Sequence, residues 1–288
     1  MTEATKVPIC LFVPTKNEEA NLARCLQSVS WVDEIFVVDS QSTDRTTKIA
    51  LEHSATVVQF EYKGGLPKKK NWALENLPFS HEWVLILDAD ECLPTEAEDE
   101  IRKIVSNPNE KHAGYWINRR YFFLGKPLNH AYFPNWNLRL FKHKLGRYEK
   151  ITELNTDSGD NEIHEHVLVQ GTTGKINSIM DHYAFPSIDS FIEKHNRYSN
   201  WEAVVESSAE DDETALQHDG VRGKRRLRKI FRKLPFRPTL RFLYVYFWQK
   251  GILDGWRGYI FARLHAQYEF LSQAKTKAIL AGREETRD

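Results

Sequence analysis

Short apolar runs alternate with helically spaced segments along the first hundred residues of the chain. Apolar runs of strand length cover residues 7–14, 35–38, 55–60 and 83–87. Segments with helical spacing or a helix start signal follow at residues 17–29, 43–51, 69–77 and 95–105. This alternation predicts right-handed crossovers between parallel strands. We therefore expect an α/β fold with a mainly parallel sheet and helices on both faces.

The pattern changes after residue 113. Short aromatic-rich strands are expected at residues 115–123, 137–142 and 163–169. From residue 188 onward the spacing of apolar positions is helical again. We expect one domain over residues 1–187, divided into a strand–helix half (about 1–113) and a more irregular half (about 114–187). An α-helical C-terminal region follows at residues 188–288.

Composition and charge narrow the class of protein. With 288 residues, 41% of them apolar, the chain can bury a sizeable core, which excludes intrinsic disorder. Its 40 basic and 40 acidic side chains cancel, so bulk electrostatic binding to nucleic acid is disfavoured. Cys10, Cys25 and Cys92 form no ligand-like cluster, which argues against a disulfide scaffold or a zinc module. Neither a signal-peptide pattern nor an uncharged apolar stretch of about 20 residues is present, so we expect the cytoplasmic side of the membrane.

Two carboxylates follow the fourth apolar run. Asp88 and Asp90 are two positions apart, and in an extended chain this spacing aims both toward the same side. Ligands of open α/β sheets bind beyond the carboxyl ends of the strands, where these residues belong. Carboxylates suit Mg²⁺ or Mn²⁺ that is bound together with substrate phosphates. The pattern predicts a metal–diphosphate site, and a solvated turn with a helix N-cap is the alternative for this short motif.

Polar residues also follow the first two strands. The stretches PTKNEE, at residues 14–19, and DSQSTD, at residues 39–44, place hydrogen-bonding side chains at the same edge of the expected sheet. Helix capping is the alternative for Asn17 and Thr43, because both residue types are favoured N-caps. Three polar clusters at one edge favour a ligand, and the first two can hydrogen-bond a base and a ribose.

Several spaced stretches of the chain resemble a known family. The stretches PTKNEEANLARCLQSVSWVDEIFVVDSQSTDRT, GGLPKKKNWAL and WVLILDADE look like glycosyltransferase family 2, which has the Rossmann-like GT-A fold. The resemblance is greatest to bacterial lipopolysaccharide-core glucosyltransferases. It continues through GYWINRRYFFLGKPL, WNLRLF, IHEHVLVQG and HNRYSNW, and so covers about residues 7–201. Gln41 stands where glycine is common in the family, and Asn137 where glutamine is common.

The resemblance implies roles for named residues. The residues implied at or near the nucleotide are Pro14, Thr15, Glu18, Asp39, Asp44, Lys70, Asn71 and Asp88. Asp90 is implied at a divalent metal, Mn²⁺ or Mg²⁺, which would stabilise the charge on the departing diphosphate. His182 is a candidate further metal ligand, with a structural histidine as the alternative. Lys68 and Lys69 can add positive charge, although a solvated lysine run is more common.

Glu165 is the candidate general base. In the expected strand, alternation puts Glu165 on the apolar side with Ile163 and Val167. A carboxylate drawn into an apolar pocket has a raised pKa, which suits it to accept the proton of an acceptor hydroxyl. The family resemblance also places a His-Glu pair here. An exposed strand glutamate is the alternative.

The C-terminal region is basic and then aromatic. Residues 222–241 contain ten basic side chains, and residues 242–270 contain ten aromatic ones. Clustered Lys and Arg bind anionic headgroups, and aromatic side chains prefer the bilayer interface. Lys250, Asp254 and Arg257 make a membrane crossing too costly. We favour binding to the inner-leaflet membrane surface, with packing on the catalytic domain or on a second subunit as the alternative and nucleic acid as a lesser rival.

Together these features predict an inverting glycosyltransferase. The expected donor is a nucleotide sugar, UDP-glucose or another UDP-hexose, and the expected acceptor is a membrane glycolipid such as lipopolysaccharide core, or an oligosaccharide. We expect a peripheral protein on the inner face of the plasma membrane, without a nucleic-acid partner, and leave a homo-oligomer open. A nucleotidyltransferase acting on a sugar phosphate and a non-catalytic sugar-nucleotide-binding membrane protein are the alternatives. The chain lacks the glycine-rich phosphate loop expected of the former.

Overall fold

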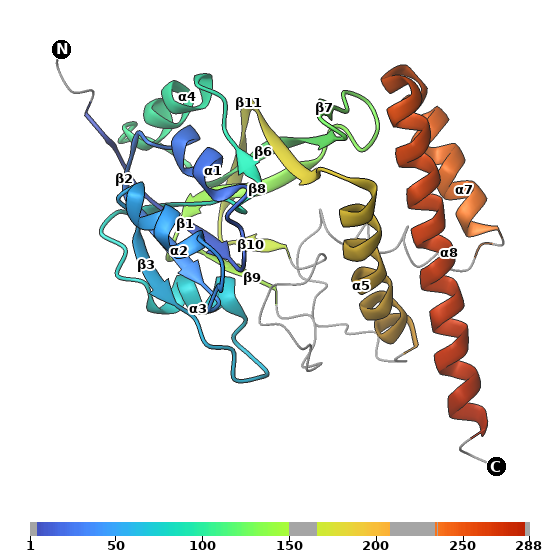
Figure 1. Cartoon of the computed structure of the whole chain (residues 1–288). Coiled ribbons are helices and arrows are strands. Elements are labelled where there is room, and N and C mark those ends of the chain that lie inside the picture. Colours follow the sequence, from blue (N-terminus) through green and yellow to red (C-terminus); the bar gives the residue numbers. More distant parts are fainter. Residues whose placement is uncertain (1–4, 150–165, 208–233, 235, 286–288) are drawn as a thin grey trace. The chain divides into compact units, whose positions relative to one another are not determined.

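The computed structural model describes residues 5–149, 166–207, 234 and 236–285 (Figure 1). The chain divides into two compact units. The first comprises Met1–Arg120 and Asn135–Tyr183, and the second comprises Tyr121–Pro134 and Ala184–Asp288. The domain boundary expected after residue 187 stays a prediction.

A nine-stranded mixed sheet has the order β3-β2-β1-β4-β8-β6-β11-β5, with β7 paired to β6. Its parallel strands are β1 (Val7–Thr15), β2 (Val32–Asp39), β3 (Thr56–Gln59) and β4 (Trp83–Ile86). The remaining strands are β5 (Glu91–Cys92), β6 (His112–Phe123), β7 (Lys126–Pro127), β8 (Trp136–Lys142) and β11 (Thr172–Phe185). β8 pairs antiparallel with β4 and β6, and β5 pairs antiparallel with β11. β9 (Gly146–Tyr148) and β10 (Val167–Val169) form a separate antiparallel pair.

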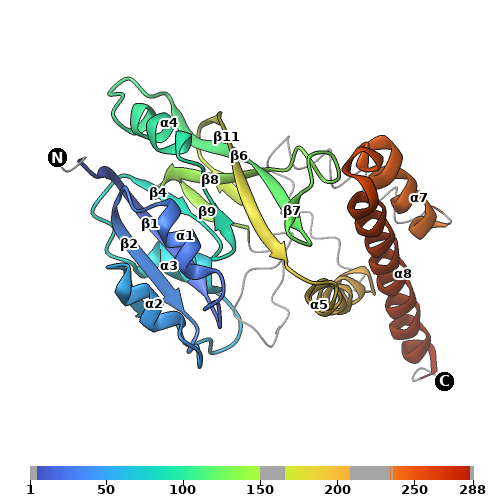
Figure 2. The ribbon, with the colours of Figure 1, turned by 45° about the horizontal axis from the view of Figure 1, so that its top comes forward.

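Helices cover both faces of the parallel strands (Figure 2). They are α1 (Leu22–Ser28), α2 (Thr46–Glu52), α3 (Lys69–Asn76) and α4 (Glu96–Val105). Ile9, Leu11 and Val13 of β1 share a core with α1, α2 and α4, whereas Phe12 shares a core with α3. Because β1 is buried on both faces, its sequence is almost continuously apolar. The α/β fold expected from the sequence is confirmed.

The second unit is mainly helical. It contains α5 (Ile188–Ser207), α7 (Arg237–Leu243) and α8 (Gly255–Glu285), and α8 contacts both other helices (Figure 1). A π-helical turn, η2 (Tyr244–Trp248), and a 3₁₀ turn, η3 (Gly251–Asp254), connect α7 to α8. Aromatic side chains dominate its core, with Phe123, Phe185, Phe191 and Phe261 all buried. The helical C-terminal region expected from the sequence is therefore present.

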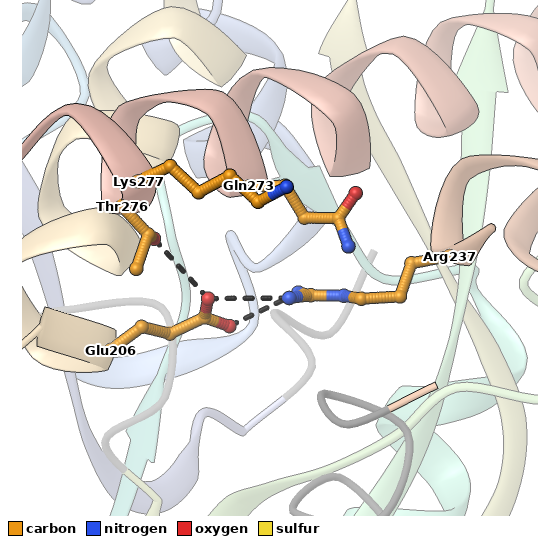
Figure 3. A pocket seen from close by; sticks show the side chains of 5 residues that line it. All are labelled: Glu206, Arg237, Gln273, Thr276 and Lys277. Carbon is orange, nitrogen blue, oxygen red and sulfur yellow. Dashed lines mark hydrogen bonds and ion pairs between the residues drawn. The ribbon is translucent and has the colours of Figure 1, made fainter. Parts of the chain in front are cut away.

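A buried ion network joins α5, α7 and α8 (Figure 3). Arg237 of α7 donates to Glu206 of α5 at 3.1 Å and to Glu269 of α8 at 2.7 Å. Thr276 also donates to Glu206, at 3.3 Å. A surface pocket of about 280 Å³ opens beside Arg237, Glu206 and Thr276. Because Arg237 is already paired with two carboxylates, we interpret these residues as an ion-pair network that stabilises the packing of the helices.

Candidate active site

Asp90 and His182 meet because two short segments pair in the sheet. β5 follows Asp90 directly and runs antiparallel to β11, with His182 opposite Glu91. The Tyr183 N–H donates to the Asp90 carbonyl at 2.8 Å, which extends this pairing by one position. His182 Nε2 consequently lies 3.1 Å from Asp90 Oδ1, and both residues are more than 90% buried. The sequence predicted these two metal ligands from segments about ninety residues apart, and the structure brings them into contact.

Asp88 forms a separate, charged cluster. Its carboxylate accepts from Lys70 Nζ at 2.7 Å and from Arg139 at 2.6 Å. Burial acts to raise the pKa of Asp88, but Arg139 and Lys70 outweigh it and hold the pKa well below its usual value. Burial acts in turn to lower the pKa of Lys70, whereas Asp88 raises it above its usual value overall. Asp88 is therefore a carboxylate and Lys70 an ammonium group at neutral pH.

Glu91 and Arg139 complete this cluster, and neither is among the site residues predicted from the sequence. Glu91 is fully buried and accepts from Arg139, from Arg119 at 3.0 Å and from the Asp88 N–H at 3.0 Å. Arg139 lies on β8 within the apolar stretch LRLF, and a charged residue in such a strand is the signal that indicates it. The network fixes the backbone at Asp88 as well as its side chain.

The cluster is held together by ion pairs. Among the described residues, the cations Lys70, Arg119 and Arg139 pair with the carboxylates Asp88 and Glu91. The cations are held in place by ion pairs before any ligand arrives, so little reorganisation is needed on binding. Preorganised lysine and arginine side chains beside the Asp90–His182 pair suit a diphosphate that is bound together with a divalent cation.

The Asp90–His182 pair fits a metal that is shared with a substrate. In the described part of the chain, no three His, Cys, Asp or Glu side chains converge as a metal-binding group. A carboxylate oxygen and an imidazole nitrogen are suitable ligands for Mn²⁺, and a carboxylate oxygen suits Mg²⁺. Two protein ligands leave most coordination positions to phosphate oxygens and water. The residues present therefore fit a metal–diphosphate unit.

Thr15 and Asp39 lie side by side at the carboxyl ends of β1 and β2, where they pair in register, and Pro14 precedes them on β1. Asp39 is fully buried, and its carboxylate accepts from Thr15 Oγ1 at 3.1 Å, the Ser42 N–H at 2.9 Å and Gln59 Nε2 at 3.0 Å. These hydrogen bonds fix the turn after β2. The side chains predicted around the nucleoside thus lie at the expected edge of the sheet.

The loops after β1 and β2 are tied together. The Glu18 N–H donates to Thr46 Oγ1 at 2.8 Å, and the Glu19 N–H donates to Asp44 at 3.1 Å. Burial acts to raise the pKa of Asp44, but hydrogen bonds from Thr46 and Glu19 lower it below its usual value. Asp44 also accepts the N–H of Thr46, the first residue of α2, at 2.9 Å, so its carboxylate has a structural role in addition to any contact with a ligand.

The start of α3 links Thr15, at the end of β1, to the cluster around Asp88. Lys69 Nζ donates to the Thr15 carbonyl at 3.0 Å, and the next residue, Lys70, pairs with Asp88. Lys68 and Lys69 are only 1% and 2% exposed, so the solvated-surface alternative is wrong for them. The Asn71 side chain exchanges two hydrogen bonds with the Tyr148 backbone, at 2.9 and 3.0 Å, and so ties α3 to β9. Glu165, the predicted general base, lies outside the described residues.

Comparison with known proteins decides the family. The model of "Glycosyl transferase family 2" matches residues 10–161, more than half of the chain. The chain belongs to glycosyl transferase family 2. The family, the α/β fold and the enzyme class, a glycosyltransferase, are thus as the sequence predicted.

Relatives of this family 2 glycosyltransferase include one protein named for lipopolysaccharide core biosynthesis. It is 30% identical over 285 residues to the lipopolysaccharide core biosynthesis glycosyltransferase LpsC of Rhizobium meliloti, covering 94% of this chain and 92% of that protein. It is 32% identical over 199 residues to an uncharacterized glycosyltransferase of Rickettsia typhi. That match covers 68% of this chain and just under two thirds, 66%, of the Rickettsia protein.

Solved structures resemble this family 2 glycosyltransferase more distantly. Glucosyl-3-phosphoglycerate synthase from Mycobacterium tuberculosis, in complex with Mn²⁺, UDP and glucosyl-3-phosphoglycerate, is 24% identical, with a TM-score of 0.30. The match covers 40% of this chain and 44% of that one. A structure of S. aureus TarS is 16% identical with a TM-score of 0.41, covering 94% of this chain and 91% of that one.

Proposed function

We propose that this glycosyltransferase moves a hexose, most simply glucose from UDP-glucose, onto a membrane glycolipid such as lipopolysaccharide core. The observation that carries the proposal is the preorganised ion-pair cluster of Lys70, Arg139 and Asp88 beside the buried Asp90–His182 pair. This arrangement suits the diphosphate and metal of a nucleotide sugar. The relative named for lipopolysaccharide core biosynthesis, aligned over 94% of this chain, supports the acceptor class.

In the proposed donor complex, each group of residues has one task. Those assigned to the nucleoside are Pro14, Thr15, Glu18, Asp39 and Asp44. Lys70, Asn71 and Asp88 lie at the diphosphate side, and Arg139 holds Asp88 there. Asp90 and His182 would hold Mn²⁺ or Mg²⁺, which when bound neutralises charge on the departing UDP. Lys70 adds a fixed positive charge at the same place.

Glu165 is assigned the proton transfer. Its carboxylate accepts the proton of the acceptor hydroxyl while the hydroxyl oxygen forms a bond to the anomeric carbon. The bond between that carbon and the UDP oxygen breaks, and its electron pair leaves with UDP. Attack from the face opposite UDP inverts the configuration at the anomeric carbon. A base of this kind contributes about 10²- to 10⁴-fold to the rate.

The proposed place of action is the inner face of the plasma membrane. A soluble nucleotide sugar and a lipid-anchored acceptor meet only at a membrane surface, so a peripheral enzyme suits this pair of substrates. Among the helices that the structure describes, none combines the length and the apolar composition that crossing a bilayer requires.

A product assay tests the proposed reaction. The enzyme is incubated with UDP-glucose, Mn²⁺ and lipopolysaccharide-core acceptor, and UDP and glycosylated acceptor are quantified. We expect one UDP for each glucose transferred. Release of pyrophosphate from UTP and glucose 1-phosphate would instead indicate a nucleotidyltransferase. Binding of UDP-glucose without either product, across a panel of acceptors, would indicate a non-catalytic binder.

The same assay tests Glu165 with a matched pair of variants. Glu165→Gln should lower transfer by about 10²-fold or more while UDP-glucose binding is retained, because the amide cannot accept the proton. Glu52→Gln makes the same change at an exposed position of α2 and should leave transfer unchanged. Normal transfer by Glu165→Gln would move the base to another carboxylate, such as Asp157 or Asp160.

A further inference from the structure

Exposed apolar side chains concentrate in one short stretch of the second unit. Among the described residues, half of the sixteen exposed large hydrophobic side chains lie within residues 243–259. They are Leu243, Tyr244, Phe247, Trp248, Ile252, Leu253, Trp256 and Tyr259. Trp248 is 80% exposed and Leu253 is 64% exposed. We call this stretch, which contains η2, η3 and the start of α8, the aromatic turn. Single exposed apolar residues are common, whereas a cluster of eight indicates a binding surface.

Hydrogen bonds fix the aromatic turn to a neighbouring loop. The side chain of Asp254 is only 3% exposed. Its carboxylate accepts three successive backbone N–H groups, from Asn129 at 2.9 Å, His130 at 3.1 Å and Ala131 at 2.8 Å. The next N–H, that of Tyr132, donates to Gln249 at 3.2 Å. The turn is therefore tied at two points to the loop after β7.

Close backbone packing makes the aromatic turn compact. A Cβ atom on Gly258 would lie 1.9 Å from the Gly251 carbonyl oxygen, and one on Gly251 would lie 2.7 Å from the Val245 carbonyl oxygen. Only glycine permits these approaches, and Val245 itself is fully buried. The exposed side chains are thus carried by a tightly packed backbone, so little conformational freedom is lost when they bind.

The charge of the aromatic turn and its surroundings is positive. Between residues 243 and 263 the basic residues are Lys250, Arg257 and Arg263, and the one acid, Asp254, is occupied by backbone N–H groups. In the part of the chain that the structure describes, these three cations form no ion pair with a carboxylate. The Arg257 guanidinium lies 4.4 Å from the ring centroid of Trp256, so a cation and an indole ring share one surface.

We propose that the aromatic turn is a wedge that inserts into the interface of an anionic phospholipid bilayer. Its apolar side chains would enter the boundary between headgroups and acyl chains, while Lys250, Arg257 and Arg263 contact lipid phosphates. Trp and Tyr prefer this zone because their rings are apolar and their N–H and O–H groups stay hydrated. A symmetric contact with a second copy would instead bring cations onto cations. The inference rests on the proposed membrane acceptor, whose surface the wedge would bind.

Vesicle co-sedimentation of the full chain tests the wedge. Phosphatidylcholine vesicles with and without phosphatidylglycerol serve as probes. The double variant Trp248→Ser with Leu253→Ser should lower partitioning onto anionic vesicles by at least about tenfold, because two large apolar side chains no longer leave water. Leu51→Ser removes a leucine of equal exposure, 64%, from α2 and should leave partitioning unchanged. Wild-type partitioning of the double variant would overturn the proposal.

A charge variant separates lipid attraction from other occupants of the surface. Lys250→Gln should lower partitioning onto anionic vesicles by about fivefold and leave the weaker binding to neutral vesicles unchanged. Sedimentation velocity is measured in parallel. If the wild type is a dimer that the double variant dissociates while vesicle binding persists, the surface joins two copies and the proposal is wrong. If the wild type binds a DNA duplex and not vesicles, and the double variant loses that DNA binding, the proposal is also wrong.

Transfer to a soluble core oligosaccharide distinguishes failure of the wedge from failure of the proposed function. The double variant should keep wild-type turnover with this lipid-free acceptor, which also shows that it is folded, and should lose turnover with acceptor embedded in vesicles. If both acceptors are used as well by the double variant as by the wild type, the wedge is wrong and the transferase stands. If the wild type transfers to neither acceptor but binds vesicles through the wedge, the proposed function fails alone.

Discussion

At the scale of single residues, Arg139 connects two carboxylates that were identified in different ways. Asp88 is evident in the sequence as part of Asp-Ala-Asp after an apolar run, whereas Glu91 is the residue that the structure shows to be fully buried. Arg139 donates to both of them. Burial acts to lower the pKa of Arg139, but Asp88 and Glu91 raise it well above its usual value. The guanidinium is therefore a fixed positive charge in the candidate active site.

Replacing Arg139 should damage stability and ligand binding together. Arg139→Met leaves buried Glu91 with one cation fewer, so we expect a loss of about 3 kcal/mol in the free energy of unfolding. UDP affinity should also fall, since the site loses a fixed cation and Lys70 is then the ion-pair partner that Asp88 keeps among the described residues. Denaturant unfolding and UDP titration measure the two effects. The control is Lys142→Met on the same strand, because the Lys142 ammonium group pairs with an exposed glutamate outside the cluster. Wild-type stability and affinity in Arg139→Met would contradict this account.

Some site residues were predictable from the sequence and others were not. Asp88 and Asp90 follow β4, Thr15 and Asp39 are the last residues of β1 and β2, and a strand end is visible as the limit of an apolar run. The pairing of Asp90 with His182 depends on the register of β5 and β11, which local patterns do not encode. The same limit applies to Arg139, because β8 pairs antiparallel with β4 across a long stretch of chain.

At the scale of elements, α5 and α8 pack through an aromatic and histidine-rich contact. His195 of α5 stacks on Phe191 with a centroid distance of 3.7 Å and packs edge-on against His265 of α8 at 5.2 Å. Burial lowers the pKa of His195 to about 4 and that of His265 well below its usual value. Both imidazoles are therefore neutral in the folded chain at neutral pH.

Acid should weaken this helix pair. Unfolded histidine takes up a proton near its ordinary pKa of 6.5, whereas folded His195 does so only near 4, so the unfolded state binds more protons in between. The free energy of unfolding is therefore highest above pH 6.5 and falls as the pH drops. For His195 alone the fall is about 2 kcal/mol between about pH 7.5 and pH 5. Denaturant unfolding followed by helical circular dichroism measures this loss. His195→Gln should reduce the pH-dependent loss in the free energy of unfolding by that amount. An unchanged pH dependence in this variant would show that His195 is not the group responsible.

Element positions were predicted more accurately than element ends. The strand expected at residues 35–38 begins earlier, at Val32, and the helix expected at 17–29 begins later, at Leu22. Residues 17–21 precede the helix because Asn17 adopts a φ of +55° and accepts a hydrogen bond from the Thr43 N–H. This contact between two loops is tertiary, so it competes with helix formation without leaving a local signal.

At the scale of the whole molecule, the strand–helix repeat predicts the parallel half of the sheet and no more. The later strands are aromatic-rich and irregular in spacing. β9 and β10 form a separate pair, whereas β6, β8 and β11 join the same sheet through antiparallel pairs. Their pairing places Arg139 and His182 beside the acidic segment after β4. The candidate active site therefore combines a part of the fold that the sequence predicts with a part that long-range pairing determines.

The central claim is that Asp90 belongs to a site for a divalent cation and UDP. Calorimetric titration of UDP into the protein, with and without Mn²⁺, tests it on the wild type, on Asp90→Asn, and on Asp99→Asn as an exposed control on α4. We expect Mn²⁺ to tighten UDP binding to the wild type and to Asp99→Asn by at least about tenfold, and Asp90→Asn to lose that gain. An equal effect of Mn²⁺ on UDP binding by all three proteins would contradict the account.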